Sequence, residues 1–217
     1  MIFKDSLIYI LSKLIPSGLG FATGITLSWL LSPEDYGLYG YGMAVATMVS
    51  TIGFEWLGLS FMRFKQKHGD DPRFMPTVMM LFLGLCALSL ALMSGLAATM
   101  NQDRAALLLI CTLGAWGYSY FEMAGRVVIA NFQSSRYFWM NLVRNLGILA
   151  ASIGLATLFS SPMLVLLGGF CAMLTSGLAF WQAPLFPRRF DPVLARQLFR
   201  YGMPMMATMT LYAIHAN

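Results

Sequence analysis

The sequence has few charged residues for its length. Only 11% of its 217 residues are Asp, Glu, Lys or Arg, whereas 58% are hydrophobic. A water-soluble domain carries roughly 25% charged residues, so this composition excludes a soluble globular protein and indicates an integral membrane protein. Apolar runs recur to the end of the chain, which excludes a single cleavable signal peptide as their explanation.

Residues that commonly carry chemistry are also scarce. The chain has three cysteines and two histidines, and their spacing is not typical of a metal site. Cys86, Cys111 and Cys171 lie within apolar runs, so we interpret them as packing residues. The sequence contains no nucleophile elbow or phosphate-binding loop, and its short polar segments leave no room for a soluble catalytic domain. We therefore expect neither an enzyme nor a bound metal or cofactor.

The apolar runs predict six complete membrane spans and the beginning of a seventh. About 20 apolar residues in a helix cross roughly 30 Å of hydrocarbon. The runs are rich in small residues and lack period-2 alternation, which favours closely packed helices over barrel strands. The expected fold class is therefore an all-α integral membrane protein. The predicted spans are residues 7–31, 37–61, 74–98, 105–129, 138–159 and 162–186, with a seventh beginning near Tyr201.

The positive charges predict how these spans are oriented, because segments rich in Lys and Arg stay in the cytoplasm. With a cytoplasmic N-terminus, 13 of the 14 cations lie in inner segments and only Arg104 lies in an outer turn. SPEDYG (32–37) is then an outer turn, in which Pro33 ends the first helix and Gly37 permits the reversal. The net charge of +5 is explained better by this membrane topology and by contact with anionic lipid headgroups than by binding of nucleic acid. Nucleic acid is therefore not an expected partner.

Five ionisable residues inside the predicted spans are the candidate functional residues, because charges are costly in hydrocarbon. All five lie toward the predicted cytoplasmic side. We interpret Lys13, Arg126 and Arg144 as ligands for an anionic headgroup in a water-filled cavity. Glu55 and Glu122 would balance this charge or bind a coupling ion.

A structural interpretation of the same residues stays open. They would then form intramembrane ion pairs that hold the helices together, and the arginines would extend to the inner membrane surface. The pairs expected from depth and spacing are Lys13 with Glu55, and Glu122 with Arg126.

The seventh apolar run echoes the first. Residues 198–217 (LFRYGMPMMATMTLYAIHAN) have a cationic start followed by a proline-bearing apolar stretch, and they loosely echo residues 5–24 (DSLIYILSKLIPSGLGFATG). Two helices that begin alike, six spans apart, indicate a six-helix unit that starts again, so we divide the chain into residues 1–197 and 198–217. Pro16 is expected to kink the first span, as prolines do in cavity-lining helices and in ordinary packed helices.

Three segments carry a resemblance to a known family: LSWLLSPEDYGLYGYG, WLGLSFMRF and LFRYGMPMM. They resemble bacterial polysaccharide-biosynthesis flippases of the Wzx type, in the multidrug/oligosaccharidyl-lipid/polysaccharide exporter (MATE-like) superfamily. The resemblance implies two six-helix lobes that enclose a cationic cavity. It also implies that an undecaprenyl-pyrophosphate-linked oligosaccharide moves from the cytoplasmic to the periplasmic leaflet by alternating access. The resemblance carries no catalytic residue onto this chain.

The sequence departs from the family pattern because it holds one lobe and only the start of a second. The resemblance therefore implies an N-terminal lobe in the bacterial inner membrane. Its expected partners are lipid-linked oligosaccharide, membrane lipids, a second lobe and other glycan-assembly proteins. Two alternatives stay open, namely a drug or metabolite exporter of the same superfamily and a noncatalytic membrane scaffold for glycan assembly.

Overall fold

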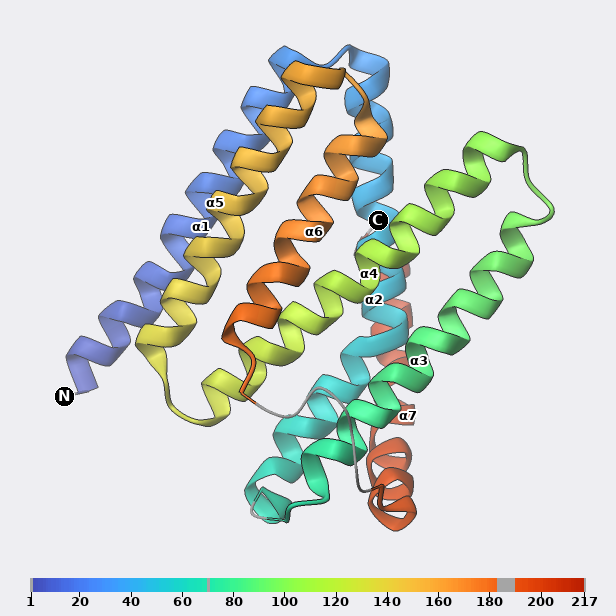
Figure 1. The fold of residues 1–217 in the computed structure, drawn as a ribbon. Helices are drawn as coiled ribbons and strands as arrows, with labels where there is room; N and C mark the ends of the chain where they lie inside the picture. The colour runs from blue at the N-terminus through green and yellow to red at the C-terminus, as the bar shows by residue number, and fades with distance from the viewer. Residues whose placement is uncertain (1, 70, 183–189, 217) are drawn as a thin grey trace.

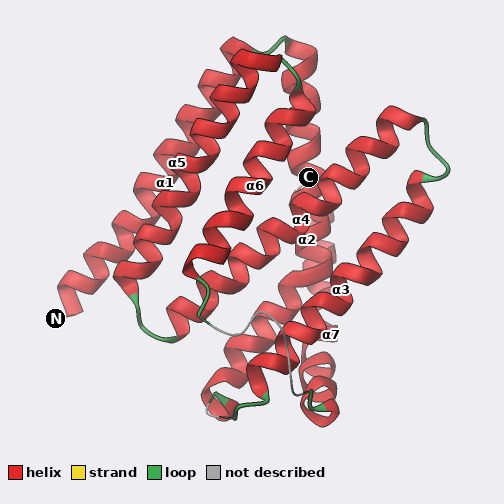
Figure 2. Cartoon of the chain, viewed as in Figure 1, coloured by secondary structure: helices red, strands yellow, loops and turns green. Residues whose placement is uncertain are grey.

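The computed structural model describes residues 2–69, 71–182 and 190–216, except for the side chains of residues 2–9, 12, 207 and 209–216. The described residues form seven α-helices and no strand (Figure 2). The predicted all-α fold class is thus confirmed. The helices are α1 (Ile2–Leu30), α2 (Pro33–His68), α3 (Phe74–Ala97), α4 (Gln102–Ala130), α5 (Ser134–Phe159), α6 (Pro162–Phe180) and α7 (Pro192–Ala216).

Each predicted span coincides with one of these helices. Among the described residues, α2, α3, α5 and α6 are long and apolar enough to cross a membrane, so the chain is a multi-pass membrane protein. The crossings assigned to α1 and α4 stay predictions. α6 ends at Phe180, before the predicted end of its span, and residues 183–186 of that span lie outside the described residues. α7 begins at Pro192, so the predicted domain boundary at 197/198 falls inside this helix.

The first reversal of the chain lies earlier than the sequence suggested. α1 ends at Leu30, and the Ser32 hydroxyl caps α2 by accepting a hydrogen bond from the Asp35 backbone N–H at 3.1 Å. Pro33 is the first residue of α2, where its fixed φ and missing donor suit a helix start. Gly37 therefore lies within α2, and the prediction that it forms the reversal was wrong.

The helices pack in an order that differs from their order in the chain (Figure 1). α1 lies along α5, α5 packs on α6, and α6 packs on α4. α4 in turn packs on α2, which also contacts α7, while α3 lies beside α4 and α2. α4 therefore sits between the α1–α5–α6 group and the α2–α3–α7 group.

The connections alternate between the two ends of the lobe (Figure 1). Residues 31–32, 98–101 and 160–161 lie at one end, whereas residues 69, 71–73, 131–133 and the start of α7 lie at the other. Most of the described cations that lie near helix ends or in connections are at the second end, whereas Arg104 lies near the first end. The sequence bias in charge is thus a spatial separation of charge between the two ends.

Small residues let α7 approach α2 closely. A Cβ atom at Gly202 would collide with the indole of Trp56, so only glycine fits at this contact. Ser60 donates a hydrogen bond to the Leu198 carbonyl at 3.1 Å across the same interface. These contacts fix the first half of α7 against α2.

Charged groups hold the start of α7 to the α2–α3 connection. Asp191 accepts hydrogen bonds from the first backbone N–H groups of α7, and its own backbone N–H donates to the Thr77 hydroxyl at 3.0 Å. Arg73 lies 3.0 Å from Asp191 and 3.0 Å from Asp71. The Arg73 side chain, chiefly through its hydrogen bond, lowers the pKa of the Asp71 carboxyl below 3.8.

We predict that Arg73→Gln raises the pKa of Asp71 toward 3.8. A lowered carboxyl pKa favours the folded state above the ordinary pKa, and this contribution is lost as the pH falls through the lowered value. Carboxyl NMR titration of the detergent-solubilised chain measures the shift. Arg63→Gln, which removes an exposed cation from α2, should leave Asp71 unchanged. An unaltered Asp71 titration in Arg73→Gln contradicts the assignment.

Candidate functional site

An ion pair joins α2 to α4 about one turn before the end of α4. The Arg126 guanidinium contacts the Glu55 carboxylate and also donates to the Glu55 backbone carbonyl at 3.3 Å. The two side chains are only 15% and 29% exposed, respectively. A Cβ atom at Gly58 would collide with this guanidinium, so the missing side chain provides the space that Arg126 fills. The pair is therefore enclosed by the α2–α4 interface.

A second, more open pair joins α4 to α5. An Arg144 amino group lies 3.8 Å from the Glu122 carboxylate, whose side chain is 36% exposed. The Arg144 guanidinium also lies 4.4 Å from the ring centroid of Phe121, within range of a cation–π interaction. The Nε of Arg144 is buried and makes no hydrogen bond with a described residue. Arg144 therefore keeps an unused donor in a partly buried position.

Arg144 lines a cavity of about 380 Å³ that is bordered by five helices. Of the residues lining it, Arg144 alone is charged, and Thr23, Tyr39, Tyr118 and Asn145 add polar atoms. The remaining walls are apolar or glycine. A cation facing such a cavity can bind a small anionic group, because a guanidinium presents several donors in a planar fork.

Lys13 reaches α5 near the connection that precedes it. Its amine donates to the Tyr137 hydroxyl at 2.9 Å and lies 5.3 Å from the centroid of that ring. Tyr137 packs in one cluster with Phe121, on which the Arg144 guanidinium rests. Lys13 and Arg144 are therefore linked through two aromatic rings, and Lys13 lies outside the residues that line the cavity.

The structure separates the three cations that the sequence predicted as ligands. Arg144 faces the cavity, Arg126 is held by Glu55, and Lys13 reaches Tyr137. Both ion pairs expected from the sequence were wrong, because Glu55 pairs with Arg126 and Glu122 pairs with Arg144.

Helix order and helix geometry explain these changes of partner. α1 packs chiefly along α5, which carries Lys13 away from α2 and Glu55. Glu122 and Arg126 lie one turn apart on nearly the same face of α4, and both line a small pocket together with Glu55. Glu55 is the partner of Arg126 from α2, and Arg144 is the partner of Glu122 from α5. Pro16 is buried, and α1 continues through it as one helix, so the predicted kink stays a prediction.

Sequence reasoning missed two buried amides and one glycine of this site. Asn141 donates to the Tyr137 carbonyl at 2.9 Å, and Asn145 donates to the Asn141 carbonyl at 2.8 Å. Their four-residue spacing within an apolar run was a usable signal for one polar face. Gly58 gave no such signal, because the sequence does not show which side chain of another helix packs against a glycine.

The fold and the site define a multi-pass, all-α membrane protein with two charge pairs centred on α4 and a cation-lined cavity beside one of them. The described residues contain no group of His, Cys or acidic side chains suited to a metal ion. The sequence model for polysaccharide biosynthesis proteins matches residues 2–217, so the chain belongs to this family. Searches of curated proteins and of solved structures found no match.

We predict strong coupling between Glu55 and Arg126. Glu55→Gln and Arg126→Gln should each lower the free energy of unfolding by about 2 kcal/mol, because each leaves one partly buried charge unpaired. The double variant should lose less than the sum of the two, which unfolding in mixed detergent micelles would show. Arg63→Gln on the exposed face of α2 should change stability by less than about 0.5 kcal/mol. Additive losses would contradict the coupling.

We also predict that Gly58 and Gly53, on the same helix, respond oppositely to alanine. A Cβ atom at Gly53 meets no atom within 4 Å, so Gly53→Ala should stabilise the protein by up to about 1 kcal/mol through helix propensity. Gly58→Ala should destabilise it, because the new methyl group displaces the Arg126 guanidinium. Thermal unfolding in detergent compares the two variants. Equal stabilisation by both would show that Arg126 does not need this space.

Proposed function

We propose that this chain is a lobe of a flippase that moves undecaprenyl-pyrophosphate-linked oligosaccharide across the bacterial inner membrane for polysaccharide biosynthesis. Membership of the polysaccharide biosynthesis family supports this proposal. The observation that carries it is the placement of Arg144, a largely buried cation that lines a cavity among apolar helices and whose Nε makes no hydrogen bond with a described residue. The chain acts as a transporter and not as an enzyme.

The pyrophosphate is the part of this substrate that most needs a protein site. Transferring its charges through hydrocarbon is very costly, and fixed cationic donors replace the water contacts that the group loses. Arg144 offers a fork of donors that matches phosphate oxygens. The 3.8 Å separation makes the contact with Glu122 weak, so an anion can replace Glu122 as the partner of the guanidinium. The Glu122 side chain is 36% exposed and keeps access to water.

The other charged residues take different roles in this proposal. Lys13 lies on α1 toward the cation-rich end, where it supplies an early contact for the anionic headgroup. Arg126 and Glu55 form the structural pair that keeps α2 and α4 together. We place the N-terminus and the cation-rich end in the cytoplasm, following the distribution of Lys and Arg.

α7 begins the second lobe in this proposal, in which the first six helices form one side of the transport cavity. The internal prolines of α1 and α7 support the idea that a similar unit starts again. The lipid tail stays in the bilayer while the headgroup occupies the cavity. Two cavity orientations with different access then suffice for movement between leaflets.

We predict that a strain lacking the gene accumulates lipid-linked oligosaccharide in the cytoplasmic leaflet and that the intact gene reverses this accumulation. Arg144→Gln should lower transport at least about tenfold, because the phosphate loses a charge-assisted hydrogen bond. Arg144→Lys should retain part of the activity, since it keeps the charge but not the fork. Arg63→Gln, which removes an exposed cation outside the cavity, should transport normally.

Membrane abundance, measured in the same strains, separates binding from folding. Normal abundance with lost transport in Arg144→Gln supports the binding role, whereas lost abundance shows that Arg144 is structural. Absence of accumulation in the strain without the gene contradicts the flippase and favours an exporter or a scaffold.

A further inference from the structure

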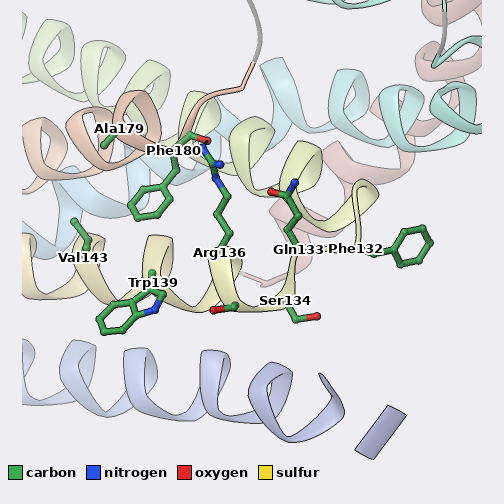
Figure 3. A pocket seen from close by; sticks show the side chains of 9 residues that line it. Phe132, Gln133, Ser134, Arg136, Trp139, Val143, Ala179 and Phe180 are labelled. Carbon is green, nitrogen blue, oxygen red and sulfur yellow. Dashed lines mark hydrogen bonds between the residues drawn. The ribbon is translucent and has the colours of Figure 1, made fainter. Parts of the chain in front are cut away.

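A second hollow, of about 770 Å³, lies where the α4–α5 connection meets the beginning of α5 and the end of α6 (Figure 3). It is separate from the cavity at Arg144, and the two share no lining residue. Arg136 and Arg144 are eight residues apart on α5, which corresponds to about 12 Å along the helix. This hollow therefore has no place in the proposed transport cavity.

The lining of this hollow changes from polar to apolar along α5. Gln133, Ser134 and Arg136 lie at the end nearest the connection, whereas Trp139 and Val143 lie further along the helix (Figure 3). Arg136 and Val143 are about 10 Å apart along the axis at 1.5 Å per residue. The hollow is thus amphipathic over a length that covers a headgroup and the first part of an acyl chain.

The position of the hollow suits the surface of a membrane. α5 and α6 are both long and apolar enough to span the bilayer, so their ends at this connection lie near its polar boundary. Phe132 is 94% exposed and Trp139 is 53% exposed beside the hollow. Exposed aromatic side chains are enriched at this depth of the membrane. The polar end therefore lies at headgroup level and the apolar end faces the hydrocarbon.

Arg136 is fixed in place without being neutralised. It donates to the Phe180 backbone carbonyl at 3.1 Å, and its guanidinium lies 5.9 Å from the Phe180 ring centroid. With its amide turned to satisfy its neighbours, Gln182 accepts a further hydrogen bond from Arg136 at 2.7 Å. Both partners are neutral, and no acidic residue is among the described residues that line the hollow. Within the described part of the chain, the positive charge of Arg136 is therefore held in place without an acidic partner at the edge of the hollow.

We propose that this hollow binds one anionic phospholipid, with its phosphate diester against Arg136 and the hydroxyl groups of Ser134 and Ser135. One acyl chain would lie along Trp139 and Val143, which a soluble phosphate compound would leave exposed to water. A zwitterionic lipid would fit the apolar part but would place a second cation near Arg136. The site therefore prefers a lipid with net negative charge, and its occupant ties the α4–α5 connection to the membrane.

Lipid retention by the full chain tests this proposal. The purified protein would be placed in detergent micelles that contain either dioleoyl phosphatidylglycerol or dioleoyl phosphatidylcholine. Native mass spectrometry would measure how much of each lipid stays bound, and thermal unfolding would measure the Tm with each lipid. We expect tighter binding and a larger rise in Tm with phosphatidylglycerol. Arg136→Gln should weaken phosphatidylglycerol binding about tenfold, to the level of phosphatidylcholine, and Arg136→Lys should restore part of it. Arg63→Gln should retain the preference.

A second variant avoids the contact between Arg136 and α6. Ser135→Asp adds a negative charge at the exposed first turn of α5, where an acid is compatible with the helix. It should abolish the preference for phosphatidylglycerol and leave the Tm in detergent alone unchanged. Gln102→Asp is the matched control, because it adds the same charge to the exposed first turn of α4, near the opposite end of the lobe.

The source of the phosphate is tested by competition. Soluble glycerol 3-phosphate at the same concentration should not displace phosphatidylglycerol, because it lacks the acyl chain that fills the apolar part. Full displacement would show a site for free phosphate esters and overturn the lipid proposal. An unchanged preference in both Arg136→Gln and Ser135→Asp would also overturn it.

Discussion

The need to pair charges in apolar surroundings is the constraint on which this structure depends. A charged side chain inside a membrane helix must meet an opposite charge or reach water. α4 carries both Glu122 and Arg126, and each is paired with a residue of a different helix. The pair with Glu55 joins α4 to α2, one of its main packing partners, and the pair with Arg144 adds a charged contact to α5, which packs on α4 much less than α6 does. The two pairs thus link α4 to both groups of helices.

The two pairs differ in a way that suits different roles. Arg126 fills the space left by Gly58 and binds both the carboxylate and the backbone of Glu55, so its position is determined by several contacts. Arg144 has a longer separation from its carboxylate, an unused donor and a cavity beside it. The proposed function therefore assigns the tight pair to the contact between α2 and α4, and the loose pair to anion binding.

The sequence predicted the helices and identified the few charged residues within them, but it did not predict which residues these charges pair with. Long apolar runs specify helices directly, because length and composition decide which segments are stable in a bilayer. The partner of each charged side chain depends on which helices are neighbours in space. α1 packs mainly along α5 and makes few contacts with α2, the helix that follows it in the chain. The start of α2 could have been predicted, since Ser32 followed by Pro33 and two acids is a typical helix start, but the reversal was wrongly placed at Gly37. The role of Gly58 was not readable without knowing that Arg126 faces it.

Hydrogen bonding at the α1–α5 interface bears on how such a lobe can move. The buried amides of Asn141 and Asn145 donate to carbonyls of their own helix, so these bonds do not depend on α1. A hydrogen bond from Lys13 to Tyr137 does cross the interface, at its rim, where Lys13 is exposed. The two amide donors are therefore satisfied by their own helix whether or not α1 lies beside them. In the proposed transport cycle, a shift of α1 against α5 leaves neither amide without a partner.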